Sequence, residues 1–415
     1  MMKETKKTTM KKTTAGPRLS RRVRSLEVSP TVAMAQRAGA LKAKGVRVLD
    51  FSVGEPDQPT PAHVAAAGKA AIDAGRTKYT PAAGLPELRA AVVERYTRDF
   101  GVSFAPEEAA ITVGGKQALF LLGQTLLDKG DEVIVPAPCW PTFPETVRLA
   151  GGVPVFVRTT EKEGFRIQAK QIARAVTKKT RAVVLNTPSN PTGAIIASDE
   201  LLKIGELARR RDFTLLYDDT YGHLTFREVE PVLQALRDRI GDRLVILGTA
   251  SKTYCMTGWR IGWVLGPRAL VDACAALCSH STQSPATFAQ LGAVEALTGP
   301  QDLVHQLREE YRRRRDFVQA TLRAFPDVSL VEPAGGFYAF PNLARYLTRA
   351  VPTTLALSLR LLDEKGVAVV PGEGFSAPGY VRLSFARSHD ELREGLARMR
   401  EFLATLREGP AARTA

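Results

Sequence analysis

From about Ala62 to Gln290, short apolar runs alternate with longer segments of helical period. The runs are rich in Val, Ile and Leu on both faces, which is typical of strands that helices cover on each side. The expected strands are Ala110–Val113, Glu132–Pro136, Val153–Val157, Ala182–Asn186, Thr214–Tyr217, Leu244–Leu247 and Ile261–Leu265. Helices are expected between them, including Gln117–Leu127 and Leu201–Arg211. The pattern predicts an α/β fold whose large domain holds a mostly parallel, helix-covered, seven-stranded sheet.

After Thr298-Gly299-Pro300 the pattern changes. A long amphipathic helix over Leu303–Phe325 is followed by short apolar runs at Phe337–Phe340, Ala368–Val370 and Val381–Phe385, and then by a closing helix. This order predicts a smaller α+β domain. The helix Val32–Lys44 and the strand Val48–Val53 cannot pack alone, so they are expected to join it. The expected division is a disordered tail (1–19), an N-terminal segment of the small domain (20–60), a cofactor-binding domain (61–298), the C-terminal small domain (299–405) and a tail (406–415).

The formal net charge of +15 is concentrated at the N-terminus, where residues 1–24 hold nine Lys/Arg and one Glu. This Lys/Thr-rich stretch has almost no apolar residues and contains no recognisable DNA-binding module, so no nucleic-acid partner is expected. No apolar run approaches the roughly 20 residues of a membrane span. The four cysteines show neither metal-ligand spacing nor a disulfide framework, which fits a metal-free protein of the cytoplasm.

The segment Ser251–Gly262 carries the most specific chemical signal. Lys252, beside a hydroxyl residue, precedes Arg260 by eight positions, and Arg260 opens the apolar run Ile261–Leu265. A lysine at the end of a strand can hold an aldehyde cofactor as a Schiff base. An arginine a short turn later can bind the cofactor's phosphate, because guanidinium matches two phosphate oxygens at once. The alternative is a surface lysine followed by an ordinary strand.

Two further strand ends fit the same kind of site. In Val113–Ala118 a strand feeds a helix through Gly114 and Gly115, and free N–H groups at a helix start attract phosphate. Asp218 follows an apolar strand, where it can keep a pyridine nitrogen protonated, and Tyr221 comes three residues later. The alternative for Asp218 is a cap of the next helix.

Three more residues complete the candidate site. Asn190 lies in the rigid turn Asn186–Gly193 and can donate its amide to an oxygen in the site. Trp140 follows a strand and can stack on a flat ring, although a half-buried packing role is the alternative. Arg382 is a charge inside an apolar strand and requires a partner, either a substrate carboxylate or an internal salt bridge.

From about Ser20 to Leu403 the chain resembles the class I aminotransferases of fold type I, which use pyridoxal 5'-phosphate. The motifs Asn190-Pro191-x-Gly193 and Ser251-Lys252…Gly258-Trp259-Arg260 carry the resemblance, which is greatest to bacterial aspartate aminotransferases of the branch that includes prephenate-using members. The resemblance implies a ping-pong exchange of an amino group, through aldimine and ketimine intermediates, between an amino acid, aspartate by preference, and 2-oxoglutarate.

The resemblance also implies roles for the cofactor-binding residues. Lys252 would carry the cofactor and shuttle the proton, Asp218 would pair with the pyridinium, and Tyr221 would bind the ring's phenolic oxygen. Trp140 would stack on the ring beside the substrate, and Arg260 would bind the phosphate.

Around them, the N–H groups of Gly115 and Lys116 would also bind the phosphate. Arg382 would bind the substrate α-carboxylate, with help from the Gly54 backbone and from Asn190, which also lies at the cofactor.

The same resemblance implies a homodimer with shared active sites, in which Tyr79 reaches the phosphate of the partner's cofactor. In this branch, residues at the positions of Lys116 and Thr31 favour a second carboxylate on the substrate. Cys139 stands where a tyrosine commonly precedes the tryptophan, and this departure bears on substrate preference. Alternative functions are a prephenate or aromatic aminotransferase and a C–S lyase or biosynthetic synthase on the same fold. A cofactor-binding regulator is the non-enzymatic alternative.

Overall fold

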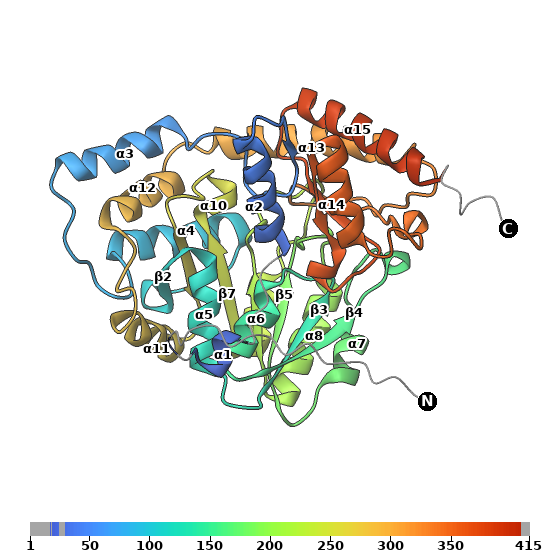
Figure 1. The fold of residues 1–415 in the computed structure, drawn as a ribbon. Helices are drawn as coiled ribbons and strands as arrows, with labels where there is room; N and C mark the ends of the chain where they lie inside the picture. Colours follow the sequence, from blue (N-terminus) through green and yellow to red (C-terminus); the bar gives the residue numbers. More distant parts are fainter. Residues whose placement is uncertain (1–16, 18, 25–29, 408–415) are drawn as a thin grey trace.

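The computed structural model of the protein describes residues 17, 19–24 and 30–407. The expected N-terminal tail lies almost wholly outside these residues, as does most of the expected C-terminal tail. A seven-stranded sheet forms the centre of the larger domain (Figure 1). In spatial order its strands are β2 (Ala109–Val113), β8 (Ile261–Leu265), β7 (Leu244–Thr249), β6 (Thr214–Asp218), β5 (Thr180–Asn186), β3 (Glu132–Ala137) and β4 (Val153–Arg158).

The sheet is mostly parallel. Neighbouring strands from β7 through β6, β5 and β3 to β4 pair in parallel, whereas β8 is antiparallel to both β2 and β7. The predicted α/β fold is therefore confirmed. All seven predicted strands form, with ends that differ by no more than two residues, because strand ends depend on pairing partners rather than on local sequence.

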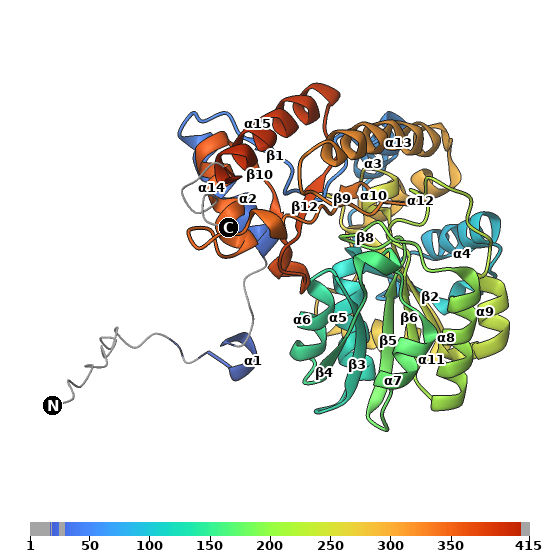
Figure 2. The ribbon, with the colours of Figure 1, turned by 90° about the vertical axis from the view of Figure 1, so that its right-hand side faces the viewer.

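Helices cover both faces of the sheet, which explains why the strands are apolar on both sides. In Figure 2, α5 (Gly114–Leu126) and α6 (Thr142–Leu149) lie on one side of the strands, and α4 (Pro86–Phe100), α8 (Ser198–Arg211) and α9 (Leu233–Ile240) on the other. The remaining helices of this part are α3 (Ala62–Asp73), α7 (Ala169–Ala175), α10 (Ala250–Thr253), α11 (Arg268–Ser279) and α12 (Thr287–Thr298). Short 3₁₀ turns are η1 (Pro106–Glu108), η2 (Glu161–Glu163), η3 (Gly241–Arg243), η4 (Ala344–Tyr346) and η5 (Gly372–Phe375).

The C-terminal part has its own core. It comprises α13 (Asp302–Arg323), β9 (Tyr338–Ala339), α14 (Thr354–Lys365), β10 (Val367–Ala368), β11 (Val370–Pro371), β12 (Val381–Ser384) and α15 (His389–Arg407). The predicted strand Ala368–Val370 is wrong as a single strand: β10 pairs with β1, whereas β11 pairs with β12 in another sheet. The chain changes sheets at Val369, which local sequence cannot reveal.

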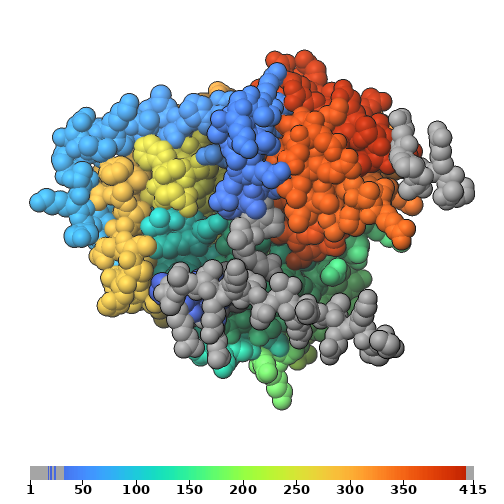
Figure 3. Space-filling view, in the orientation of Figure 1, coloured from blue at the N-terminus to red at the C-terminus, as the bar shows by residue number. Residues whose placement is uncertain are grey.

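The N-terminal segment packs against this C-terminal part. Helix α2 (Pro30–Ala43) contributes Met34 and Ala38 to a core with Leu362 and Ala368. In Figure 3 this segment, in blue, lies against the orange surface of residues near 350. Strand β1 (Leu49–Asp50) pairs in parallel with β10, but it is shorter than predicted. These contacts support our proposal that the N-terminal segment belongs to the small domain.

At the end of β1 the Asp50 carboxylate accepts hydrogen bonds from the backbone N–H and the hydroxyl of Ser52. The chain then turns toward the large domain. The short helix α1 (Arg21–Arg24) lies near α6. None of the helices in the described ranges is long and apolar enough to cross a membrane. Within the same ranges, His, Cys, Asp and Glu side chains form no cluster suited to a metal ion.

Candidate active site

The carboxyl edge of the parallel strands gathers the predicted residues. Asp218 ends β6, opposite Asn186 of β5 and Leu247 of β7. Helix α10, which contains Lys252, begins directly after β7, and the Thr249 hydroxyl caps it by accepting a hydrogen bond from the Ser251 N–H. Open α/β sheets bind their ligands at this edge. The structure therefore brings the lysine and the aspartate to neighbouring strand ends.

Lys252 is held toward the domain boundary. Its Nζ donates a hydrogen bond of 2.7 Å to the Gly54 carbonyl, in the loop that follows β1. Burial lowers the pKa of Lys252 to about 8, and the nearby Glu55 carboxylate opposes this shift. A neutral amine is therefore accessible close to neutral pH, as attack on an aldehyde requires.

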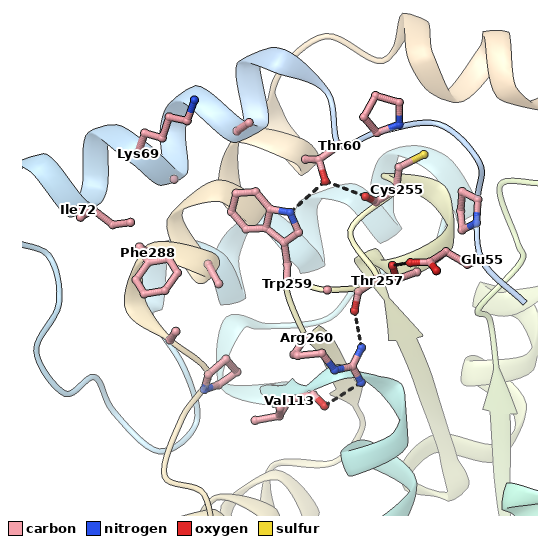
Figure 4. Close-up of a pocket in the computed structure, with 18 of the residues that line it drawn as sticks. Glu55, Thr60, Lys69, Ile72, Val113, Cys255, Thr257, Trp259, Arg260 and Phe288 are labelled. Carbon is pink, nitrogen blue, oxygen red and sulfur yellow. Dashed lines mark hydrogen bonds between the residues drawn. The ribbon is translucent and has the colours of Figure 1, made fainter. Parts of the chain in front are cut away.

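Arg260 lies over the start of α5 (Figure 4). Its Nη1 donates to the Thr257 carbonyl at 2.7 Å, and its Nη2 lies 3.5 Å from the Val113 carbonyl oxygen. Gly114 has a φ of 73°, in the left-handed region that favours glycine, and a Cβ there would lie 2.5 Å from Arg260 Nη2. Arg260 itself has a φ of 59°, a strained value for a residue other than glycine.

The cradle fits a phosphate group. The first N–H groups of α5, including those of Gly115 and Lys116, lack helical partners because they belong to its first turn. The helix was predicted to start at Gln117, but it starts at Gly114, because the glycines form the first turn rather than a loop. N–H groups at a helix start and an arginine above them suit an anion.

Asp218 is buried, with 4% of its surface exposed. Its Oδ1 accepts a hydrogen bond of 3.0 Å from the Thr220 N–H, in a turn rather than at a helix start. Burial raises the pKa of Asp218, and no basic side chain of the described residues forms a salt bridge with it. A buried carboxylate without a cation suits a protonated ring nitrogen.

Arg382 meets carbonyl oxygens and aromatic rings. Its Nη1 donates to Asn190 Oδ1 at 3.0 Å and its Nη2 to the Ser52 carbonyl at 2.7 Å, while its buried Nε has no partner. The guanidinium carbon lies 4.3 Å from the centre of the Tyr338 ring and 5.1 Å from that of Phe375. Within the described chain no carboxylate pairs with it, so the internal salt bridge considered above does not form.

Tyr221 lies next to this arginine. Its hydroxyl shares a hydrogen bond of 3.0 Å with the hydroxyl of Tyr338, and burial raises its pKa well above the ordinary value. Sequence reasoning missed Tyr338. The signal was the pair Gly335-Gly336 before it: a Cβ at Gly335 would lie 2.5 Å from Pro188 Cγ, so the glycine lets this strand approach the turn that carries Asn190.

Lys116 and Trp140 contact each other. The Lys116 Nζ lies 5.4 Å from the centre of the Trp140 ring, which also meets Phe143 edge-on. Partial burial, and then the Arg260 charge, lower the pKa of Lys116. Cys139 beside them is buried, and burial raises its thiol pKa to about 12, which disfavours the nucleophilic thiolate.

The structure does not bring the remaining two predicted residues into this cluster by any described contact. Tyr79 is 94% exposed, in the loop between α3 and α4, and among the described residues no hydrogen bond or aromatic contact involves its side chain. Thr31 lies in the first turn of α2, and its side chain is outside the described part of the structure. A pocket of about 800 Å³ opens beside Arg260 (Figure 4), lined in part by Ile72 and Phe288.

The site is cationic overall. Lys116, Lys252, Arg260 and Arg382 form no salt bridge with any carboxylate that the structure describes. The other three charges each lower the pKa of Lys252, so all three lie within electrostatic reach of that lysine. Unpaired cations gathered near a buried surface require anions. This arrangement can hold a phosphate and one or two carboxylates around an amine.

A family model described as aminotransferase class I and II matches residues 46–399. The aspartate aminotransferase of Geobacillus stearothermophilus is 41% identical over 388 residues, which cover 93% of this chain and 99% of that protein. The aspartate/prephenate aminotransferase of Thermus thermophilus is 43% identical over 390 residues, 93% of this chain and 98% of that protein. The solved structure of Thermus thermophilus aspartate aminotransferase with maleate has 43% identity and a TM-score of 0.88 over 93% of this chain and 100% of that one.

Proposed function

The chain belongs to the class I and II aminotransferases, and from this premise we propose that it uses pyridoxal 5'-phosphate to move the amino group of aspartate to 2-oxoglutarate. The observation that supports the proposal most is the set of four cations without carboxylate partners in the described chain. A phosphate and the two carboxylates of a dicarboxylic substrate match this charge. The names of the relatives support aspartate as the donor.

Pyridoxal phosphate, when bound, supplies an aldehyde and a ring that withdraws electrons from the substrate's Cα. Lys252 would hold that aldehyde and would act as the base at Cα, because burial lowers its pKa to about 8 and so makes a neutral amine accessible near neutral pH. Asp218 would hold the proton of the ring nitrogen, and Tyr221 would bind the ring's phenolic oxygen. Arg260 and the α5 N–H groups bind the phosphate.

The remaining residues of the proposed site orient the substrate. Arg382 and Asn190 would bind the α-carboxylate, and Trp140 would stack on the ring. The Gly54 carbonyl, which accepts a hydrogen bond from Lys252 Nζ, would orient that amine in the site. The hydrogen bond from Lys252 to the Gly54 carbonyl connects the N-terminal loop to the large domain at the site.

We also propose that the enzyme is a homodimer with shared sites. A tyrosine that is 94% exposed, as Tyr79 is, suits a place against a partner rather than one in water. It would reach the phosphate in the partner's site. The pocket beside Arg260 has an apolar rim that includes Ile72 and Phe288 and can accommodate such a neighbour.

A panel of amino donors tests the substrate proposal. The purified protein loaded with the cofactor would be assayed with aspartate, glutamate, alanine or phenylalanine and with 2-oxoglutarate or prephenate as acceptor. We expect aspartate to give the highest kcat/KM among donors other than glutamate. Prephenate is the second candidate acceptor, because several relatives are aspartate/prephenate aminotransferases. A higher kcat/KM with alanine or phenylalanine would contradict the proposal.

Replacing Lys116 by alanine is expected to impair acidic substrates selectively. A charge-assisted hydrogen bond in a partly desolvated pocket contributes roughly 1.5–3 kcal/mol, or about 10–150-fold in kcat/KM. Alanine and phenylalanine carry no second carboxylate, so they should lose far less. The measurement is the ratio of kcat/KM for aspartate to that for phenylalanine. Lys129→Ala, which removes an exposed lysine past the end of α5, is the control. An unchanged ratio while both values fall would assign Lys116 to the cofactor instead.

Replacing Arg260 by lysine is expected to raise the dissociation constant of the cofactor about 10-fold. A single ammonium then replaces a planar guanidinium that can donate two N–H groups to the phosphate. The dissociation constant of the cofactor can be measured from its absorbance after dialysis. Arg243→Lys changes an exposed arginine that pairs with Asp212, far from the site, and serves as the control. If Arg260→Lys holds the cofactor as tightly as the unaltered protein, the phosphate is bound elsewhere.

A further inference from the structure

Asp218 and Asp219 are neighbours in sequence but point to opposite faces of the sheet. Side chains alternate along a strand, and Leu216 belongs to the core under α5, whereas Leu215 and Tyr217 belong to the core under α4. Asp218 continues the first series, on the face of the proposed cofactor site. Asp219 continues the second, on the far face, and cannot touch the cofactor.

On that far face a chain of hydrogen bonds ends at Asp219. The Trp263 indole N–H donates to the Tyr96 hydroxyl at 3.2 Å, and the Tyr96 hydroxyl donates to Asp219 Oδ2 at 2.9 Å. All three side chains are buried. Because an indole can only donate, it occupies the tyrosine oxygen as an acceptor and directs the hydroxyl proton to the carboxyl group.

Two glycines make room for this chain. A Cβ at Gly248, in β7, would lie 2.1 Å from Trp263 Nε1 and 2.5 Å from the Tyr96 hydroxyl. A Cβ at Gly222 would lie 2.0 Å from Asp219 Oδ1. Glycine weakens the interior of a strand, so its presence in β7 indicates that the space beside it is needed.

The backbone between the two aspartates is held on both sides. The Asp219 N–H donates to the Leu247 carbonyl at 2.9 Å, and the Asp218 carbonyl accepts from the Thr187 N–H at 3.3 Å. The side chain of Asp219 adds a third point of attachment through Tyr96. A shift of Asp219 would therefore turn the shared peptide and move the carboxylate of Asp218.

We propose that Tyr96 and Trp263 are positioning residues for the proposed reaction, and that they fix Asp218 by anchoring its neighbour Asp219. The inference rests on the proposed function, in which Asp218 faces the ring nitrogen. Asp219 serves as a hydrogen-bond acceptor rather than as a charge. Burial raises the pKa of its carboxyl group well above the ordinary value, which agrees with that role.

The test compares Tyr96→Phe, Asp219→Ala and Asp219→Asn in the cofactor-loaded enzyme. Tyr96→Phe and Asp219→Ala both remove the anchor, and a misplacement of about 1 Å caused by a distant substitution can cost about 100-fold in rate. We expect that loss in kcat with KM changed less than about twofold. Asp219→Asn keeps an acceptor oxygen for Tyr96 and should retain nearly all activity. Trp263→Phe should give a smaller loss in the same direction.

A spectroscopic readout separates positioning from stability. The absorbance of the bound cofactor changes with pH, which gives an apparent pKa. A weaker interaction between the Asp218 carboxylate and the protonated ring nitrogen should shift that apparent pKa. Tyr96→Phe and Asp219→Ala should shift it in the same direction as Asp218→Asn, by a smaller amount. The control is Tyr346→Phe, which removes a buried hydroxyl bonded to the Pro326 carbonyl in the small domain and should leave the titration unchanged.

Three outcomes would overturn the inference. If Tyr96→Phe and Asp219→Ala lower the melting temperature but leave kcat and the titration unchanged, the hydrogen-bond chain is merely structural. If Asp219→Asn loses as much activity as Asp219→Ala, the charge of Asp219 matters rather than its role as an acceptor. If Asp218→Asn itself matches the unaltered enzyme, the proposed role of Asp218 fails first, and that result is distinct from the other two.

Discussion

Replacing Lys252 by alanine is expected to abolish amino transfer while the fold remains intact. The change removes the amine that binds the cofactor and the group that moves the proton at Cα. Losing a proton-transfer group alone costs about 10²–10⁴-fold. The loss of packing is small, because α10 is short and the Lys252 side chain has one hydrogen-bond partner, the Gly54 carbonyl. The measurement is kcat with aspartate and 2-oxoglutarate, together with a melting curve.

A second readout checks the covalent role of Lys252. After reduction with borohydride and unfolding, the unaltered protein should retain the cofactor's absorbance, and Lys252→Ala should lose it. Lys129→Ala serves as the control in both assays. Turnover by Lys252→Ala above about a thousandth of the unaltered rate would contradict the assignment.

Replacing Arg382 by lysine is expected to lower kcat/KM about 100-fold for every amino-acid substrate. Arg382 sits between Tyr338 and Phe375, and its buried Nε has no partner in the described chain. Losing a buried charge-assisted contact costs about 2–5 kcal/mol. A lysine ammonium cannot bind a carboxylate with two parallel N–H groups, so it replaces the fork poorly.

The pattern across substrates distinguishes this effect from that of Lys116. Every amino acid has an α-carboxylate, so Arg382→Lys should affect aspartate and phenylalanine alike. The α-amide of phenylalanine lacks that carboxylate, so its turnover should fall far less, and discrimination between acid and amide should shrink. Arg243→Lys is again the control. Unchanged discrimination would place the α-carboxylate elsewhere.

The strands were predictable because each is a local pattern: Val, Ile and Leu on both faces and turn residues at the ends. Strand β8 was predicted to the residue. Segments near the domain boundary were harder to predict from the sequence. Strand β1 and the pair β10 and β11 are two residues long each, and they form because distant segments pair with them. The start of α5 was misplaced because glycines near a phosphate cradle look like a loop in sequence.

The candidate site shows the same division. The motifs around Lys252 and Asn190 identify a family, so they predicted the type of chemistry without a structure. The environment of each group could not be predicted from the sequence and is known only from the folded structure. The sequence left two possible partners for Arg382, an internal carboxylate or a substrate carboxylate. Only the structure shows that carbonyl oxygens and aromatic rings surround it. Tyr338 was not predicted, because it reaches Tyr221 across 117 residues of chain.

The sequence by itself determined the α/β architecture, the family and the order of the reactive motifs, because these depend on local periodicity and on residues close together in the chain. The tertiary structure decided which charges have partners and which face of the sheet each carboxylate occupies. Asp218 and Asp219 are equivalent in composition and adjacent in sequence, yet Tyr96 and Trp263 hold one of them and leave the other for the site. Burial and pairing are set by contacts between distant segments, and these exist only in the folded chain.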